Sequence, residues 1–103
     1  MTTINNEIMK KSGIELIAIE RQEQIEKHGR TIECDVENNE LEELSEGAWK
    51  LLIPGKERLR NRPPEGWDRD HFQKMLHKSY KERLIIAGAL IAAEIDRIQA
   101  NEE

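Results

Sequence analysis

The chain has 103 residues, which is the size of one domain with a modest core. Its residues are 36% charged and only 4% aromatic, a composition typical of amphipathic helices with charged outer faces. The net charge of −5 argues against a nucleic-acid-binding protein, whose affinity depends on neutralising phosphates. A single cysteine, Cys34, cannot form an internal disulfide, and the N-terminus lacks the pattern of a signal peptide, so we expect a cytoplasmic protein.

A first helix is predicted from Ser12 to Gly29. Ser12 and Glu15 have the spacing of a capping box, and Gly29 is a typical helix stop. Residues 1–11 are expected to add another turn or two of helix, or to fray. Residues 29–39, GRTIECDVENN, are predicted to form a loop.

A second helix is predicted after Asn38 or Asn39, either of which could cap it, and it should end at Pro54-Gly55. Its apolar positions form a helical stripe: Leu41, Leu44, Ala48, Leu51 and Leu52. Residues 54–67 contain three prolines and a run of basic residues between 56 and 62. This segment predicts a long irregular connection, which is either a binding loop or a solvated linker.

A third helix is predicted from Asp68 or Asp70 to about Gln99, either continuous or broken near residues 77–79. We therefore expect one all-α domain over residues 1–103, an antiparallel bundle of three or four helices. The uncharged stretch 84–93 is about half the length of a membrane span, so no membrane association is expected. It is too apolar on all sides for a three-helix monomer, which predicts a homo-dimer or tetramer.

The carboxylate of Glu94 directly follows this uncharged stretch. On a helical wheel Glu94 lies on the side of Leu90 and Ile98 and faces the core, whereas Asp96 faces outward. A buried carboxylate is costly unless an opposite charge or a metal ion compensates it. Two interpretations stay open: an ion pair with an arginine such as Arg97, or a metal ligand.

Other carboxylates occupy the margins of the predicted apolar faces, namely Glu20 on the first helix and Glu40 and Glu43 on the second. Converging carboxylates repel one another unless a cation lies among them, and hard divalent ions prefer oxygen ligands. Together with Glu94 they predict a Mg²⁺ site, with Mn²⁺ as an alternative ion. Histidine is scarce near these positions, which disfavours zinc or a di-iron centre. The alternative is chance placement in a chain with 21 acidic residues.

Four segments carry a resemblance in order: ERQEQIEKHGRTIECD, NELEELSEGAWKLL, GWD and KERLIIAGALIAAEIDRI. They resemble the short MazG-like, all-α nucleotide pyrophosphohydrolases common in phages and prophages, over most of residues 14–98. Residues 42–46, EELSE, match the E-E-x-x-E motif of the better-studied MazG enzymes. The partner motif E-x-x-D is not evident, because Glu82 is followed three residues later by Ile85. Arg30 and Cys34 stand where the family pattern has Trp and His.

The resemblance implies hydrolysis of a nucleoside or deoxynucleoside triphosphate to its monophosphate and pyrophosphate, with Mg²⁺, in control of the nucleotide pool. It implies Glu43 and Glu94 as catalytic carboxylates. The implied substrate-binding residues are Lys78, Lys81 and Arg83 for the triphosphate and Trp67 for the base. The missing E-x-x-D motif supports an alternative, a non-catalytic helical module of mobile-element origin that keeps the fold and binds a protein or a nucleotide.

Overall fold

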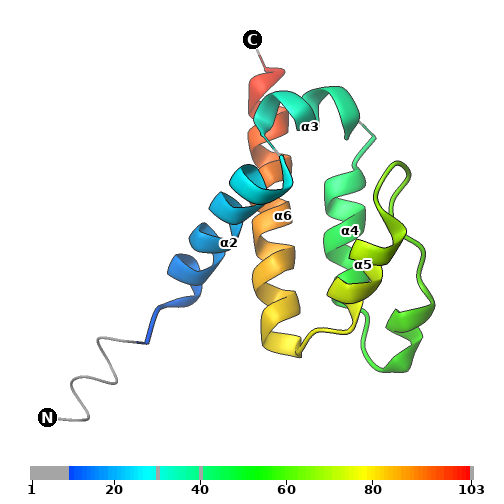
Figure 1. The fold of residues 1–103 in the computed structure, drawn as a ribbon. Helices are drawn as coiled ribbons and strands as arrows, with labels where there is room; N and C mark the ends of the chain where they lie inside the picture. Colours follow the sequence, from blue (N-terminus) through cyan, green and yellow to red (C-terminus); the bar gives the residue numbers. More distant parts are fainter. Residues whose placement is uncertain (1–9, 30, 40, 103) are drawn as a thin grey trace, which may run out of the picture.

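A computed structural model describes residues 10–29, 31–39 and 41–102, and this part of the chain is helical, without strands. Helix α6 is central in the fold: α2 and α4 pack on different sides of it, α3 crosses one end, and α5 packs on α4 (Figure 1). The all-α prediction is confirmed. The helices are α2 (Gly13–His28), α3 (Ile32–Asn38), α4 (Glu43–Leu51), the 3-10 helix η1 (Lys56–Arg60), α5 (Arg69–Leu76) and α6 (Tyr80–Ala100).

Two capping boxes define where α2 and α6 begin. The Ser12 hydroxyl accepts the backbone N–H of Glu15 at 3.2 Å, and the Glu15 carboxylate accepts that of Ser12 at 2.9 Å. Ser79 and Glu82 repeat the motif, so the chain breaks between α5 and α6, which settles the alternative left open at residues 77–79. Gly29 ends α2 in the left-handed conformation, with φ of 67°, as predicted.

The predicted loop at residues 29–39 was wrong, because it contains α3. Thr31 caps this helix by accepting the backbone N–H of Cys34 at 3.1 Å. A helix of seven residues is too short to show a periodic pattern in the sequence. The expected cap of the next helix was also misplaced: Asn39 follows the end of α3, and α4 starts only after Glu42.

The connection between α4 and α5 is more ordered than the predicted irregular loop. It contains η1, and the Arg58 side chain donates to the carbonyls of Leu76 at 2.7 Å and Gly55 at 3.0 Å. Gln73 of α5 donates to the carbonyl of Leu59 at 3.0 Å. These hydrogen bonds attach the segment to α5. Arg58, one of the basic residues predicted to lie in a binding loop or a linker, therefore has a structural role.

The hydrophobic core lies between α4, α5 and α6. Its largest fully buried members include Leu44, Leu51, Phe72, Leu76 and Leu90. Half of the stretch 84–93 is buried within the chain itself, whereas Leu84 and Ile91 remain 41% and 47% exposed. Among the helices of the described residues, none combines the length and the apolar character that crossing a membrane demands.

Candidate functional site

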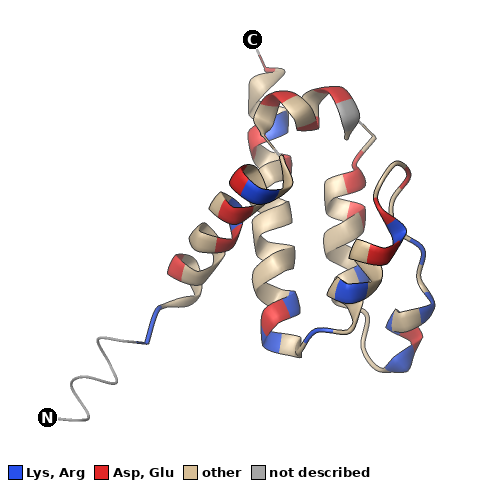
Figure 2. Cartoon of the chain, viewed as in Figure 1, with Lys and Arg blue, Asp and Glu red and all other residues tan. Residues whose placement is uncertain are grey.

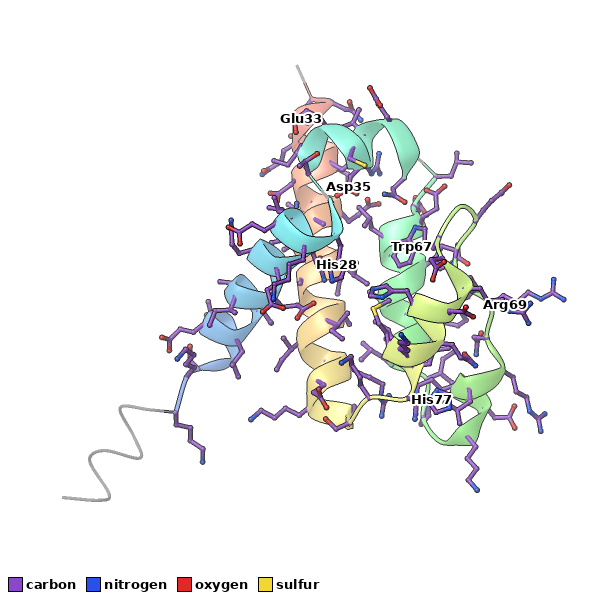
Figure 3. The ribbon with its side chains drawn as sticks, in the orientation of Figure 1. His28, Glu33, Asp35, Trp67, Arg69 and His77 are labelled. Atoms are coloured by element: carbon purple, nitrogen blue, oxygen red, sulfur yellow. The ribbon has the colours of Figure 1, made fainter. Side chains whose placement is uncertain are left out.

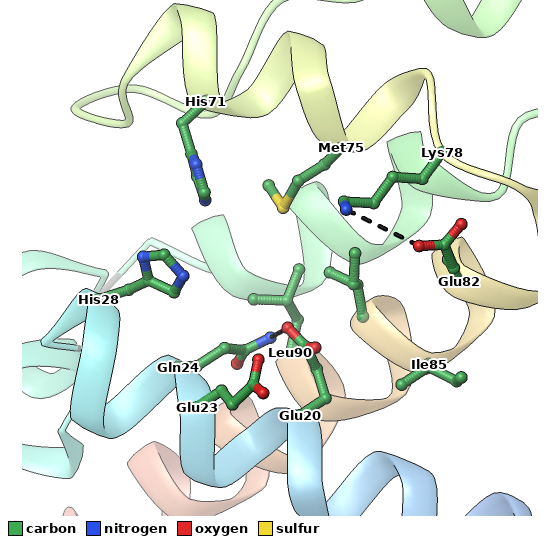
Figure 4. A pocket seen from close by; sticks show the side chains of 11 residues that line it. Glu20, Glu23, Gln24, His28, His71, Met75, Lys78, Glu82, Ile85 and Leu90 are labelled. Atoms are coloured by element: carbon green, nitrogen blue, oxygen red, sulfur yellow. Dashed lines mark hydrogen bonds and ion pairs between the residues drawn. The ribbon is translucent and has the colours of Figure 1, made fainter.

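A cavity of about 240 Å³ lies between α2, α5 and α6 (Figure 4). One wall belongs to α2, the opposite wall to α5 and the segment that joins it to α6, and apolar residues of α6 close the space between them. The polar residues of its lining are Glu20, Glu23, Gln24, His28, His71, Lys78 and Glu82. The cavity therefore combines carboxylates, two imidazoles and an ammonium group in one small volume.

The α2 wall follows from helical spacing. Glu20, Gln24 and His28 are successive fourth residues and therefore project from one face of the helix. Gln24 is only 4% exposed, and its amide nitrogen donates to the Glu20 carboxylate at 3.4 Å. Its amide oxygen has no hydrogen-bond partner in the described part of the chain. A buried acceptor left unpaired costs about 1–3 kcal/mol, so this oxygen favours a donor or a cation in the cavity.

The carboxyl group of Glu20 is short of compensating charge. Burial raises the pKa of Glu20 above its usual value, and the negative charge of Glu23 adds to the effect. The hydrogen bond from Gln24, together with the charges of His28 and Lys78, lowers the pKa of Glu20 but does not cancel the increase. A cation bound beside Glu20 would stabilise its ionised form.

An imidazole, an ammonium group and a carboxylate occupy the facing wall, from His71, Lys78 and Glu82. The Lys78 ammonium lies 3.8 Å from the Glu82 carboxylate, and the His71 ring lies with its centroid 4.9 Å from that of His28. Figure 4 shows the two imidazoles pointing toward each other from α2 and α5.

Over the described part of the fold, acidic residues gather on α2 and α3, and basic residues on η1 and around the start of α6 (Figure 2).

Glu94 lies further along α6, in a buried ion pair. The guanidinium of Arg97 donates to its two carboxylate oxygens at 2.7 and 3.0 Å. This hydrogen bonding to Glu94 is the main cause that raises the pKa of Arg97, and the charges of Glu42 and Glu43 add to it. Glu43 also accepts the backbone N–H of Leu41 at 2.7 Å. The geometry therefore matches the ion-pair interpretation of Glu94.

The four predicted metal ligands fall into separate places. Glu20 lines the cavity, Glu43 and Glu94 lie near Arg97, and Glu40 is outside the described residues. Within residues 10–29, 31–39 and 41–102, no group of three or more His, Cys, Asp or Glu side chains is arranged to hold a metal ion. The cavity offers Glu20 and Glu23 instead, and Mg²⁺ often binds through one or two carboxylates completed by substrate phosphates.

The predicted substrate-binding residues also lie in different parts of the structure. Lys78 lines the cavity, whereas Lys81 is exposed outside its lining. The buried Arg83 donates to the carbonyl of Leu51 at 2.7 Å and to that of Lys78 at 3.1 Å, so it holds the start of α6 against the end of α4.

Trp67 lies beside α4 and α5 (Figure 3), and its ring contacts both helices. Its indole N–H donates to the Asn39 side chain at 2.9 Å, and its ring packs edge-on against Phe72 with centroids 5.9 Å apart. Trp67 also lines a second cavity of about 330 Å³, which borders His28 and Asp35 as well. Trp67 is thus mainly a packing residue that stays partly exposed.

The two histidines were not among the predicted site residues, because histidine was expected to be scarce near the acidic positions. His28 could have been found, because it stands two helical turns after Glu20 on the same face. His71 could not, because only the packing of α5 brings it to α2.

No family model, no curated protein and no solved structure matches this chain. The MazG-like resemblance therefore rests on the sequence motifs alone.

Proposed function

We propose that this chain is a Mg²⁺-dependent nucleoside triphosphate pyrophosphohydrolase of the MazG-like type, acting in the cytoplasm on an NTP or dNTP. One observation supports the proposal most. Glu20 and Lys78, which the sequence suggested separately as a metal ligand and a phosphate-binding residue, line the same cavity. The unpartnered oxygen of Gln24 in that cavity adds to the case for a bound ligand.

The residues of the cavity suit the chemistry of this reaction. Lys78 would neutralise part of the triphosphate charge, and Glu20 and Glu23 would hold Mg²⁺ together with phosphate oxygens. When bound, the ion supplies stabilisation of the charge that develops between the α- and β-phosphates. A water oxygen would bond to phosphorus as the phosphoanhydride bond breaks, and its proton would pass to a carboxylate of the cavity.

The assignment of Glu43 and Glu94 changes accordingly. Both were implied as catalytic carboxylates by the resemblance, yet the nearest cation for Glu94 is Arg97 at 2.7 Å. We assign to the ion pair of Glu94 and Arg97 a supporting role, in which it stabilises the C-terminal half of α6. We assign proton transfer to the groups of the cavity.

We further propose that the protein is a homo-dimer or tetramer. Leu84, Ile91, Ile95 and Ile98 are between 41% and 51% exposed, and their spacing places them along one side of α6. Such a row of exposed aliphatic side chains is the surface through which two copies could bury apolar area.

The test is release of pyrophosphate from a panel of NTPs and dNTPs with Mg²⁺. We expect activity with at least one nucleotide, and a decrease in kcat/KM of about 100-fold in Glu20→Gln and Lys78→Ala. Glu26→Gln and Lys81→Ala are matched controls, because both residues are exposed and outside the lining of the cavity. Absence of pyrophosphate with every nucleotide would contradict the proposal.

The second candidate is a non-catalytic module that binds a protein or a nucleotide. The ion pair of Glu94 with Arg97 favours it, because that pair removes one carboxylate from any catalytic metal site. Under this candidate, a nucleotide would raise the melting temperature without releasing pyrophosphate, and the Lys78→Ala substitution would abolish that increase.

A further inference from the structure

His28 and His71 meet across the cavity although their helices belong to different parts of the fold. α2 packs on α6, and α5 packs on α4 and η1. The two rings have centroids 4.9 Å apart and planes inclined by 46°. His28 is exposed and His71 is half-buried, so an ion could reach the space between them from solvent.

The separation of the rings suits a shared metal ion. A zinc ion bonds imidazole nitrogen at about 2.0–2.1 Å, so two such nitrogens in a tetrahedral site are about 3.4 Å apart. Imidazoles with centroids 4.9 Å apart can reach that spacing by rotation about their side-chain bonds. Neutral imidazole is a good ligand for Zn²⁺, Ni²⁺ and Co²⁺, whereas Mg²⁺ prefers oxygen.

A second observation points to a cation at the same place. Gln24 stands one helical turn before His28, is 4% exposed, and presents to the cavity an amide oxygen without a hydrogen-bond partner among the described residues. Glu20, one turn earlier on the same face of the helix, also lines the cavity. The α2 wall therefore presents oxygen atoms that a positive charge would stabilise.

We propose that His28 and His71 form a two-histidine binding site for a transition-metal ion of the Zn²⁺, Ni²⁺ and Co²⁺ class. The remaining coordination positions are open to water or to the oxygens of a ligand in the cavity. The ion joins α2 to α5, so its binding stabilises the folded chain. This site does not depend on nucleotide hydrolysis, and its test needs no nucleotide.

The experiment is a calorimetric titration of the full chain with Zn²⁺, with melting curves in parallel. Wild type is expected to bind one ion per chain and to melt several degrees higher. His28→Gln and His71→Gln are each expected to weaken binding at least 10- to 100-fold, since even partners outside the ligand shell have effects of that size. His77→Gln is the matched control, because His77 is exposed, lies outside the cavity and has its ring nitrogen 2.9 Å from the Gln73 carbonyl oxygen.

Cys34 requires a control of its own, because it shares the second cavity with His28 and thiolates bind zinc. Cys34→Ser is expected to retain the affinity of wild type. Loss of binding in Cys34→Ser but not in His71→Gln would overturn the proposal, as would equal binding by all variants or none by wild type. In wild type, ring NMR signals of His28 and His71, but not of His77, should move with Zn²⁺, a readout that needs no variant to fold.

Discussion

Glu94 and Arg97 form a bidentate ion pair on α6, with side chains that are 11% and 10% exposed. Taking two charges out of water is expensive, and their mutual attraction together with good hydrogen bonds offsets much of that cost. Removing only one partner leaves an uncompensated buried charge. Here that charge would be Arg97, although Glu42 and Glu43 provide some nearby negative charge.

We expect Glu94→Gln to lower the free energy of unfolding by about 3 kcal/mol, the lower end of the range for breaking a buried pair. Glu57→Gln is the control, because Glu57 has the same spacing from Arg60 but their side chains are 76% and 82% exposed. Its effect should stay below about 1 kcal/mol in the same denaturant titration. A Glu94→Gln protein as stable as wild type, together with stabilisation of wild type alone by Mg²⁺, would favour the metal-ligand role.

Glu20 leads to a prediction about pH. Burial raises its pKa in the folded chain above the usual value of a glutamate, so the folded state holds the proton more tightly than the unfolded state. The resulting stabilisation is fully present below the unfolded pKa and is lost as pH rises through the folded pKa. Glu20→Gln should therefore melt a few degrees higher than wild type at neutral pH, and the difference should vanish in acid.

Melting curves of both proteins across this pH range, without divalent cations, provide the measurement. Glu26→Gln, an exposed position on the same helix, should follow wild type at every pH. A Glu20→Gln protein less stable than wild type at neutral pH would mean that the carboxylate has a stabilising partner.

Close approaches at two glycines fix how the helices pack. A Cβ added at Gly47 of α4 would lie 2.6 Å from the Trp67 ring, and one added at Gly88 of α6 would lie 2.6 Å from the Cδ1 of Ile17. Trp67 is held by its bond to Asn39, whereas Ile17 presents the flexible end of its side chain. α2 thus crosses α6 at Gly88, and this crossing sets the α2 wall of the cavity.

We expect Gly47→Ala to lower the free energy of unfolding by about 1–3 kcal/mol, because the indole ring cannot move without losing its packing. Gly88→Ala should cost less, since Ile17 can rotate away and alanine is favoured over glycine in a helix by about 1 kcal/mol. Denaturant unfolding measures both. Ile17→Val should reduce any loss in Gly88→Ala, and a larger loss at Gly88 than at Gly47 would contradict this account.

At the scale of the whole molecule, one side of α6 exposes a row of aliphatic side chains. Ile91, Ile95 and Ile98 keep 47%, 51% and 45% of their surface exposed, although α6 is the helix on which α2, α3 and α4 pack. Burial of these side chains against a second copy would contribute roughly 25 cal/mol for each Å² removed from water.

Sedimentation equilibrium should therefore show a dimer or tetramer at micromolar concentration. Ile95→Lys should raise the dissociation constant more than tenfold, because association would bury its charge or expose its neighbours. Trp49→Lys, on the outer side of α4 where Trp49 is 62% exposed, should leave the association unchanged. A monomeric wild type would refute the proposed assembly.

Local signals in the sequence determined where some of the helices begin or end. Ser12 with Glu15, Gly29 and Asp68 act on backbone groups within five positions of themselves, so their effects can be predicted without knowing the fold. The inward direction of Glu94 was likewise predictable, because it depends only on the helical period. The short α3 escaped prediction, because seven residues carry too little pattern.

Tertiary packing alone decided which of these residues meet. A helical wheel places Glu20, Glu43 and Glu94 on inner faces, but the depth and angle at which helices cross determine whether such faces share one space. The crossing of α2 over α6 placed Glu20 with Lys78 in the cavity and away from Glu94. The packing of α5 then brought His71 to His28, a contact between distant parts of the chain that no local pattern encodes.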